Sequence, residues 1–370
     1  MQRFKKHRLL LIVITVLLIV TGAIIWIATA ANRKTRAFLA HYEITDLTAL
    51  GLHNVVAIND KGQILGHDKQ NRICIWDEQN GLKVLNIPQE AGTCWPNAFN
   101  NYGQIAGDLY TPSGDPHAFV WDANNGLIDL GTPGGTSSGA NAINDLGHVV
   151  GCVLGSNNLS YPFLWDRNTG MLDLSAGNTI PKYRTAGDIN NAGTVLGITF
   201  IWTRDKGMVL LDTPTGGQSF ARSINNAGKI AGVFRKKSAQ PKQHLIIWED
   251  PNNWRDLGTP KNNARHTLSN PTINDVGQIV GLAIQYGILS NRCFHFFYSD
   301  ETGFIDLGEI YTSDGRLKLP KMPWQSRSRP MPVESCVLDI NNKGQIINHT
   351  KTKQGKYRTV LMTPKKAYKE

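Results

Sequence analysis

Seven asparagines recur in one short motif and carry the first side chains that could do chemistry. The motif reads I-N-[ND]-x-G, with Phe for Ile in one copy, and its asparagines are Asn59, Asn100, Asn144, Asn190, Asn225, Asn274 and Asn341. A ring of amide oxygens could hold a metal ion or a glycan. However, Asn before Gly in a short turn usually hydrogen-bonds its own backbone, and Gly accepts the positive φ of the turn. We therefore expect a structural role, and we predict no metal site and no cofactor.

Repeated aromatic and histidine residues are the second set. Tryptophan stacks on sugars, but these tryptophans share one position in each repeat, which favours packing between repeats; they are Trp76, Trp121, Trp165, Trp202 and Trp248. Two of the ten histidines, His117 and His244, both lie four residues before a Trp, which indicates a repeat feature rather than a catalytic base. No His-Glu-x-x-His, Gly-x-Ser-x-Gly, phosphate-loop or EF-hand spacing is present. An enzyme is the less favoured class.

A basic loop is the third candidate. The segment from Glu309 to Glu334 is rich in Arg, Lys and Pro and contains one tryptophan. This cluster could meet acidic lipid head groups, an anionic glycan or a protein partner, or it could be a solvated loop. It is our candidate partner-binding site, formed by Arg316, Lys318, Lys321, Trp324, Arg327 and Arg329.

The elements that position these residues form a repeat. Each motif predicts a hairpin, an apolar run ending in an aromatic residue such as Ala118–Trp121 follows, and a shorter strand such as Leu127–Leu130 completes the unit. Four short strands at roughly 35–50-residue spacing are typical of a propeller blade. Seven motifs therefore predict an all-β, seven-bladed β-propeller over residues 42–364, which we expect to be monomeric.

The ends of the repeat predict how the ring closes. The last unit has a hairpin around Asn341 and a third strand at Arg358–Met362, but no fourth strand. A spare strand, Tyr42–Leu47, precedes the first hairpin and resembles Ile128-Asp129-Leu130. Pairing of the N-terminal strand with the C-terminal strands would complete the seventh blade and cover two sheet edges. The connections of variable length would then gather on one face, which is usually the binding face.

The N-terminus predicts a membrane anchor. Residues 1–8 form a basic stub, residues 9–31 carry no charge and are long enough to span a bilayer, and residues 32–41 form a short linker. The charge distribution favours the stub inside and the propeller outside a cytoplasmic membrane, in the periplasm or at the cell surface. The small-residue run Ala28-Thr29-Ala30 leaves open a secreted protein after signal cleavage.

Charge and cysteine usage narrow the function classes. Seven of the 39 Lys and Arg flank the apolar run, which leaves 32 against 29 Asp and Glu in a nearly neutral body with a basic tail, residues 365–370. That balance does not fit a nucleic-acid binder. The five cysteines, Cys74, Cys94, Cys152, Cys293 and Cys336, show no C-x-x-C spacing. Single buried thiols are the preferred interpretation, and Cys74 with Cys94 is the best candidate pair if any disulfide forms.

One repeat resembles a known family. The string His117-Ala118-Phe119-Val120-Trp121, followed by Asp129-Leu130-Gly131-Thr132 and by the motif at Asn144, is similar to the HAF repeat, named for its His-Ala-Phe tripeptide. The resemblance extends as a pattern over nearly everything after residue 41. It implies a bacterial, exported, propeller-like protein and supplies no catalytic residues. We therefore expect a membrane-anchored binding or scaffolding module for a protein or glycan; the alternative is a polysaccharide-acting enzyme with its site at the mouth of the propeller channel.

Overall fold

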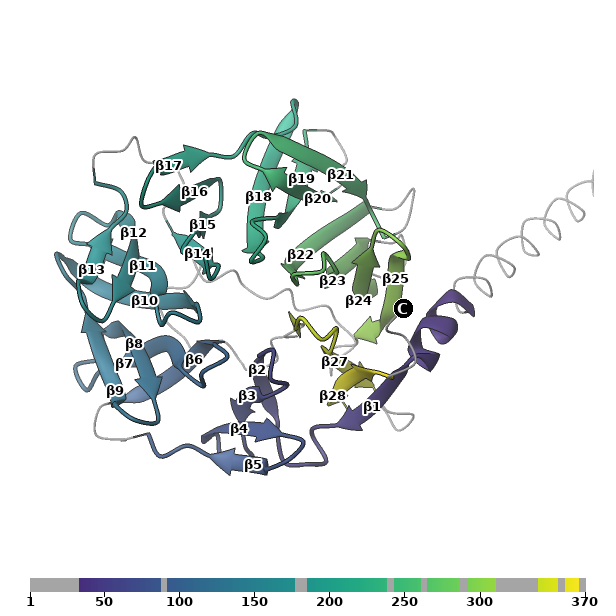
Figure 1. The fold of residues 1–370 in the computed structure, drawn as a ribbon, viewed down its shortest axis with the longest axis horizontal. Helices are drawn as coiled ribbons and strands as arrows, with labels where there is room; N and C mark the ends of the chain where they lie inside the picture. The colour runs from purple at the N-terminus through teal and green to yellow at the C-terminus, as the bar shows by residue number, and fades with distance from the viewer. Residues whose placement is uncertain are drawn as a thin grey trace, which may run out of the picture.

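The computed structural model describes residues 33–87, 92–176, 185–237, 243–260, 265–286, 292–310, 339–351 and 357–365. These residues form seven antiparallel four-stranded sheets arranged around a common axis (Figure 1). The first strand of each sheet lies innermost, at the sheet edge nearest the axis. The predicted seven-bladed β-propeller is confirmed.

The blades follow the predicted repeat closely. Blades 1 to 4 consist of β2 (Asn54–Ile58), β3 (Ile64–His67), β4 (Ile73–Asp77) and β5 (Gly81–Val84); β6 (Thr93–Phe99), β7 (Ile105–Tyr110), β8 (Pro116–Asp122) and β9 (Gly126–Gly131); β10 (Gly135–Ile143), β11 (Val149–Gly155), β12 (Ser160–Asp166) and β13 (Gly170–Asp173); and β14 (Ala186–Ile189), β15 (Val195–Gly197), β16 (Phe200–Thr203) and β17 (Gly207–Leu210). Blades 5 and 6 consist of β18 (Gly217–Ile224), β19 (Ile230–Lys236), β20 (Gln243–Asp250) and β21 (Asn253–Gly258); and β22 (Arg265–Ile273), β23 (Ile279–Tyr286), β24 (Arg292–Ser299) and β25 (Gly303–Ile310).

Blade 7 joins the two ends of the chain, as predicted. Its strands are β26 (Asp339–Ile340), β27 (Ile346–Lys351), β28 (Tyr357–Pro364) and, as the outermost strand, β1 (Tyr42–Asp46). Tyr42 pairs with Pro364 and Asp46 with Val360 in antiparallel register. An ion pair between Arg358 and Asp46 lies on the same two strands. The N-terminal strand therefore covers an edge that β28 would otherwise expose.

The segment expected as a linker is partly helical. Residues 33–40 form a helix, and the Phe38 ring lies 4.8 Å from the Phe297 ring of blade 6. The Lys34 ammonium donates to the Thr302 carbonyl oxygen at 2.7 Å, which ties the helix to the same blade. An aromatic side chain and a lysine thus hold this part of the predicted linker against blade 6. Within the described residues no helix is long and apolar enough to cross a membrane, and the apolar run 9–31 lies outside them.

The core lies between blades. The repeated tryptophans are 1–9 % exposed, and each belongs to a cluster of buried residues from neighbouring blades. Trp165 of blade 3, for example, packs in a cluster with Ala106 and Val120 of blade 2. This confirms the packing role and leaves no tryptophan of the set free to stack on a sugar.

The motif asparagines form a closed ring. Each side chain is 3–4 % exposed, and its Oδ1 accepts the backbone N–H four residues later. Each Nδ2 donates to the carbonyl oxygen of the motif asparagine in the next blade, at 2.8–3.1 Å. The last of these bonds, from Asn341 to Asn59, closes the circle across the chain ends. The side-chain amides are thus hydrogen-bonded within the fold, which is the structural role that the turn motif predicted.

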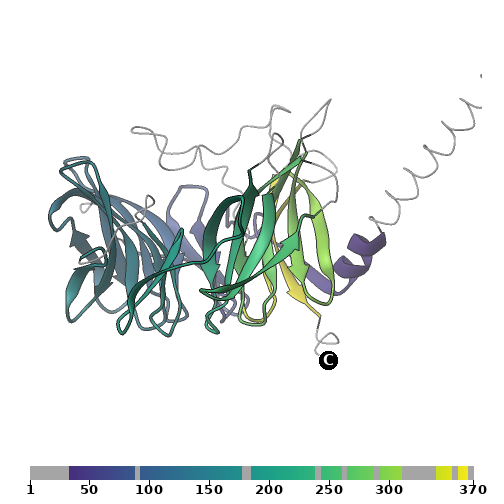
Figure 2. The same cartoon turned by 90° about the horizontal axis from the view of Figure 1, so that it is seen from above.

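A second ring lies one residue further along each motif. The backbone N–H of each member donates to the side-chain Oδ1 of the next blade's member at 2.7–2.9 Å; the members are Asp60, Asn101, Asp145, Asn191, Asn226, Asp275 and Asn342. At least one asparagine lies between any two aspartates around this ring, so no two carboxylates are adjacent. The two rings hold the seven turns on one side of the disc, which we call the turn face; the opposite side is the loop face (Figure 2).

Bulges in the inner strands explain why a second glycine follows the motif glycine after four residues in every repeat but the last. In blade 3 the pairing of β10 with β11 skips Asn141, and a Cβ on Gly151 would lie 1.9 Å from the Gly139 carbonyl oxygen. Blade 7 has Asn348 at this position. The Asn348 side chain hydrogen-bonds the buried His295 of blade 6.

Candidate functional site

The basic loop favoured by the sequence lies outside the described residues. Its six candidate side chains, from Arg316 to Arg329, all fall in 311–338. The partner-binding interpretation of Arg316, Lys318, Lys321, Trp324, Arg327 and Arg329 stays a prediction.

The two repeat histidines have matching partners in their own blades. Nδ1 of His117 lies 2.9 Å from the Asp129 carboxylate, and Nδ1 of His244 lies 2.7 Å from the Asp256 carboxylate. Each aspartate also accepts a backbone N–H from the glycine two residues later. The same His–Asp bridge between third and fourth strands occurs in blades 2 and 5. The interpretation of these histidines as a repeat feature is confirmed.

Two carboxylates near the axis also serve the repeat. Asp188 and Asp339 occupy the position before the motif isoleucine, and each accepts the isoleucine N–H of the next blade, from Ile224 at 2.8 Å and from Ile58 at 3.1 Å. Burial raises the pKa of both carboxyls to about 6, against the lowering effect of these hydrogen bonds. Their hydrogen bonds connect blade 4 to blade 5 and blade 7 to blade 1.

The described cysteines are free thiols. Cys74 is buried in the cluster between blades 7 and 1, whereas Cys94 packs against the cluster between blades 1 and 2. The pair Cys74–Cys94 is therefore not formed, because the two side chains lie on opposite faces of blade 1. Burial raises the pKa of Cys74 to about 12 and that of Cys94 to about 11. Cys152 is also free, and the side chains of Cys293 and Cys336 lie outside the described residues.

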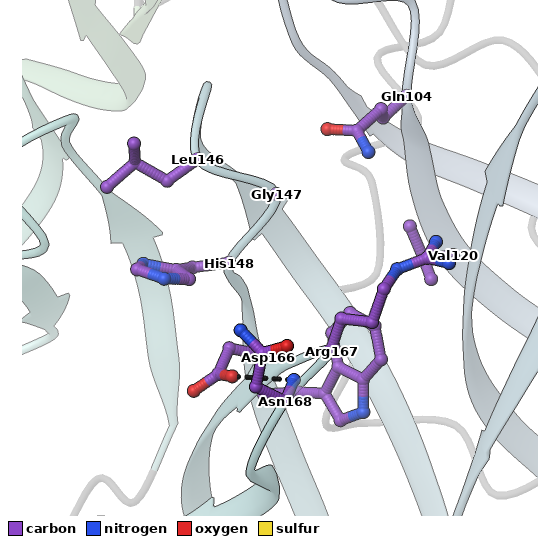
Figure 3. A pocket seen from close by; sticks show the side chains of 9 residues that line it. Gln104, Val120, Leu146, Gly147, His148, Asp166, Arg167 and Asn168 are labelled. Carbon is purple, nitrogen blue, oxygen red and sulfur yellow. Dashed lines mark hydrogen bonds between the residues drawn. The ribbon is translucent and has the colours of Figure 1, made fainter.

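Two pockets on the turn face share Leu146 and His148. The smaller has a volume of about 260 Å³ and lies between blades 2 and 3 (Figure 3). The turn carrying Leu146, Gly147 and His148 forms one side of it, and Asp166, Arg167 and Asn168 form the other. Hydrogen bonds from Thr169 hold the Asp166 pKa at about 2, so this carboxylate stays ionised.

The larger pocket is a groove of about 720 Å³ that runs from blade 3 across blade 4 to blade 5. Its apolar lining comes from all three blades: Leu146, Leu164, Ala192, Ile201, Val209 and Pro251. Charged and polar groups also line it: His148, Thr203, Arg204, Asp205, Lys206, Asp250 and Asn252. Blade 4 consists of short strands, and β15 is only three residues long. We call this pocket the turn-face groove.

His148 separates the groove from the smaller pocket. Its Nδ1 is buried without a hydrogen-bond partner among the described residues. Burial lowers the pKa of His148, the Asp166 carboxylate raises it, and the Arg204 guanidinium lowers it. A neutral imidazole next to an Arg204–Asp166 ion pair of 3.2 Å can donate or accept one hydrogen bond. In four other blades the same position holds a glutamine that bonds the motif asparagine.

Among the described residues, no group of three or more His, Cys, Asp or Glu could hold a metal ion. Asp166 accepts bonds from Thr169, Asn168 and Arg204, so its oxygens are occupied. The sequence favoured the loop face for partner binding, whereas the groove lies on the turn face. The motif position before Gly gives no specific signal, because Tyr102 and Val276 are apolar there as well as Leu146.

Comparisons with known proteins concern the fold alone. No family model and no curated protein sequence matches the chain. Among solved structures, TolB from Acinetobacter baumannii is 13 % identical, with a TM-score of 0.41 over 87 % of this chain and 80 % of that one. A gluconolactonase from Xanthomonas campestris is 8 % identical, with a TM-score of 0.38 over 84 % and 98 %. The six-bladed fucose-binding lectin of Aleuria aurantia is 11 % identical, with a TM-score of 0.36 over 71 % and 88 %.

Proposed function

We propose that this protein is a membrane-anchored propeller outside the cytoplasm that binds a protein partner through the turn-face groove, without catalysis. The observation that carries the proposal is the groove itself. It spans three blades, and it combines apolar walls with charged groups in a volume of about 720 Å³. Concave apolar sites with a few placed polar groups are the usual form of binding sites.

The lining favours a protein over a glycan. Leucine, isoleucine, valine, alanine and proline side chains form the walls, and the lining contains no Phe, Tyr or Trp. Sugars are commonly held against aromatic faces, whereas aliphatic walls suit an aliphatic side chain of a peptide or protein. Arg204 and Lys206 oppose Asp205 and Asp250 in the lining, so a partner with charges of both signs fits best.

The anchor rests on the sequence. Residues 9–31 are uncharged and flanked by Lys and Arg, and the resemblance to HAF repeats supports export from a bacterial cytoplasm. Retention of the N-terminal segment keeps the propeller on the membrane, and cleavage would release it into the periplasm or medium. Mass spectrometry of the N-terminus of the mature protein separates these two outcomes.

The groove is tested by crosslinking in cells followed by a pull-down with the full chain. Leu146→Asp places a charge between the two pockets without touching the core, because Leu146 is 64 % exposed. We expect crosslinked partner to fall about tenfold, the size of a truncated interface anchor. Val276→Asp is the matched control: it changes the same motif position in blade 6, is 69 % exposed, and lies away from the groove.

A partner that is captured equally by wild type and Leu146→Asp would contradict the groove as the binding site. A loss that Val276→Asp shares would also contradict it, since that outcome points to a general effect of charge on the turn face. Replacement of the five basic residues between Arg316 and Arg329 by Gln, in parallel, tests the loop predicted from the sequence.

A further inference from the structure

The residue at the inner-strand bulge differs between blades: blades 2 and 3 carry asparagine, whereas blade 1 has Val56, blade 4 has Gly187 and blade 6 has Pro271. The bulged residue lies two positions before the motif isoleucine or phenylalanine. In blade 2 it is Asn97, whose Nδ2 donates to the Ala140 carbonyl oxygen of blade 3 at 2.9 Å. In blade 3 it is Asn141, whose Nδ2 donates to the Ala186 carbonyl oxygen of blade 4 at 2.8 Å. The bulged side chain thus bonds the next blade at the axis-facing edge.

Blade 5 has Arg222 at this position. The side chain is half-buried, and the guanidinium carbon lies over the Phe220 ring, 5.9 Å from the ring centroid. Burial lowers the Arg222 pKa, and no carboxylate among the described residues pairs with the guanidinium. The nearby Asp188 bonds the backbone N–H groups of Ile189 and Ile224 instead. A desolvated cation without a counter-ion costs free energy, and an aromatic face offsets only part of that cost.

The facing residue in blade 6 is also unusual. Asn97 and Asn141 reach the residue three positions before the next motif's isoleucine, and in blade 6 that residue is Asn270. Here the bulge is wider, since pairing of β22 with β23 skips both Asn270 and Pro271. Asn270 has a positive φ of 47°, is exposed, and makes no side-chain hydrogen bond within the described residues. Backbone held in this region is often found at ligand sites.

We propose that Arg222 and Asn270 form an oxyanion-binding site at the axis-facing edge between blades 5 and 6. The guanidinium fork supplies two parallel donors to a carboxylate, phosphate or sulfate group. The Asn270 amide adds a donor from the next blade, and the Phe220 ring offers an apolar surface to the rest of the ligand. The site takes the place of the bond between blades that Asn97 and Asn141 make directly. It lies apart from the turn-face groove and does not depend on it.

The site is tested by thermal unfolding of the full chain in detergent with sodium acetate, phosphate or sulfate, against sodium chloride at matched ionic strength. A ligand that binds the folded state raises the melting temperature with its concentration. We expect such a rise in wild type and at least a tenfold weaker apparent affinity in Arg222→Gln, the loss of a charged bidentate contact. The three anions distinguish a carboxylate-bearing ligand from a phosphate- or sulfate-bearing one.

Three further variants make the result decisive. Asn270→Gly keeps the fold, because glycine accepts the positive φ, and should weaken binding by removing the amide. Arg255→Gln, which removes an exposed arginine paired with Asp300 on the outer edge of blade 5, should leave binding unchanged. Without anion, Arg222→Met should be at least as stable as wild type. Equal anion effects in wild type and Arg222→Gln would overturn the proposal, and so would a clear destabilisation by Arg222→Met, since both would mean that Arg222 serves the fold.

Discussion

Closure of the asparagine ring makes a quantitative prediction for Asn341→Ala. The Asn341 side chain takes part in four hydrogen bonds: Oδ1 accepts from the Lys343 and Gln345 backbones, and Nδ2 donates to the Gln345 side chain and to the Asn59 carbonyl. At about 1 kcal/mol each, and with one turn N–H reached by water, the substitution should lower the unfolding free energy by about 3 kcal/mol. For a domain of this size that is a fall of about 5 °C in melting temperature.

The comparison that tests this count is Asn225→Ala. Asn225 occupies the same ring with the same burial but makes two of these bonds, one from the Lys229 backbone and one to the Asn274 carbonyl. Urea unfolding of the full chain in detergent should give about half the loss seen for Asn341→Ala. If Asn225→Ala costs as much as Asn341→Ala or more, the stability of the ring does not follow from its hydrogen bonds, and the reasoning is wrong.

Two other positions give direct tests. The Asp339 pKa is raised from 3.8 to about 6, so its contribution to stability is full below pH 4 and is lost as pH rises through 6. Replacing Asp339 by Ala, the residue that blades 1 to 3 carry at this position, should therefore raise the unfolding free energy relative to wild type by at most about 3 kcal/mol as pH rises from 4 to 7.5. Urea unfolding free energies that change in parallel with pH for the two proteins would refute this. Gly151→Ala places a Cβ 1.9 Å from the Gly139 carbonyl oxygen and should lower the unfolding free energy by more than about 3 kcal/mol or prevent folding. Gly187→Ala should cost far less, because its Cβ would meet its nearest atom at 3.8 Å. Similar melting temperatures for the two variants would show that β10 and β11 can separate.

The sequence predicted what the repeat imposes. Asparagine and glycine at fixed spacing require a hairpin, and the motif glycines all have positive φ, between 71° and 85°. The missing fourth strand of blade 7 and the spare strand at Tyr42 together indicated closure across the chain ends, because the spare strand pairs with the edge that the last blade would otherwise leave open. These features are local or arise from counting repeats, so a single sequence suffices to infer them.

Other features depend on contacts that no local pattern encodes. The helix at residues 33–40 forms where Phe38 meets Phe297, more than 250 positions away in the chain. The inner-strand bulge is set by the approach of two backbones, so the second glycine could be seen in the sequence but not explained. The turn-face groove depends on the separation of blades 3, 4 and 5, and Leu146 alone does not reveal it, because Tyr102 and Val276 are exposed apolar residues at the same motif position.

The two proposed sites lie at repeat positions whose residues differ between blades. The residue before the motif glycine varies from Lys61 to Leu146 without consequence for the asparagine bonds, because it points away from them and is exposed. The bulged residue is different, since in blades 2 and 3 it bonds the next blade, whereas the partly buried Arg222 makes no such bond. A repeat tolerates the first kind of change freely. An arginine without a counter-ion at the second position costs stability in the unliganded protein, and a bound anion would offset that cost.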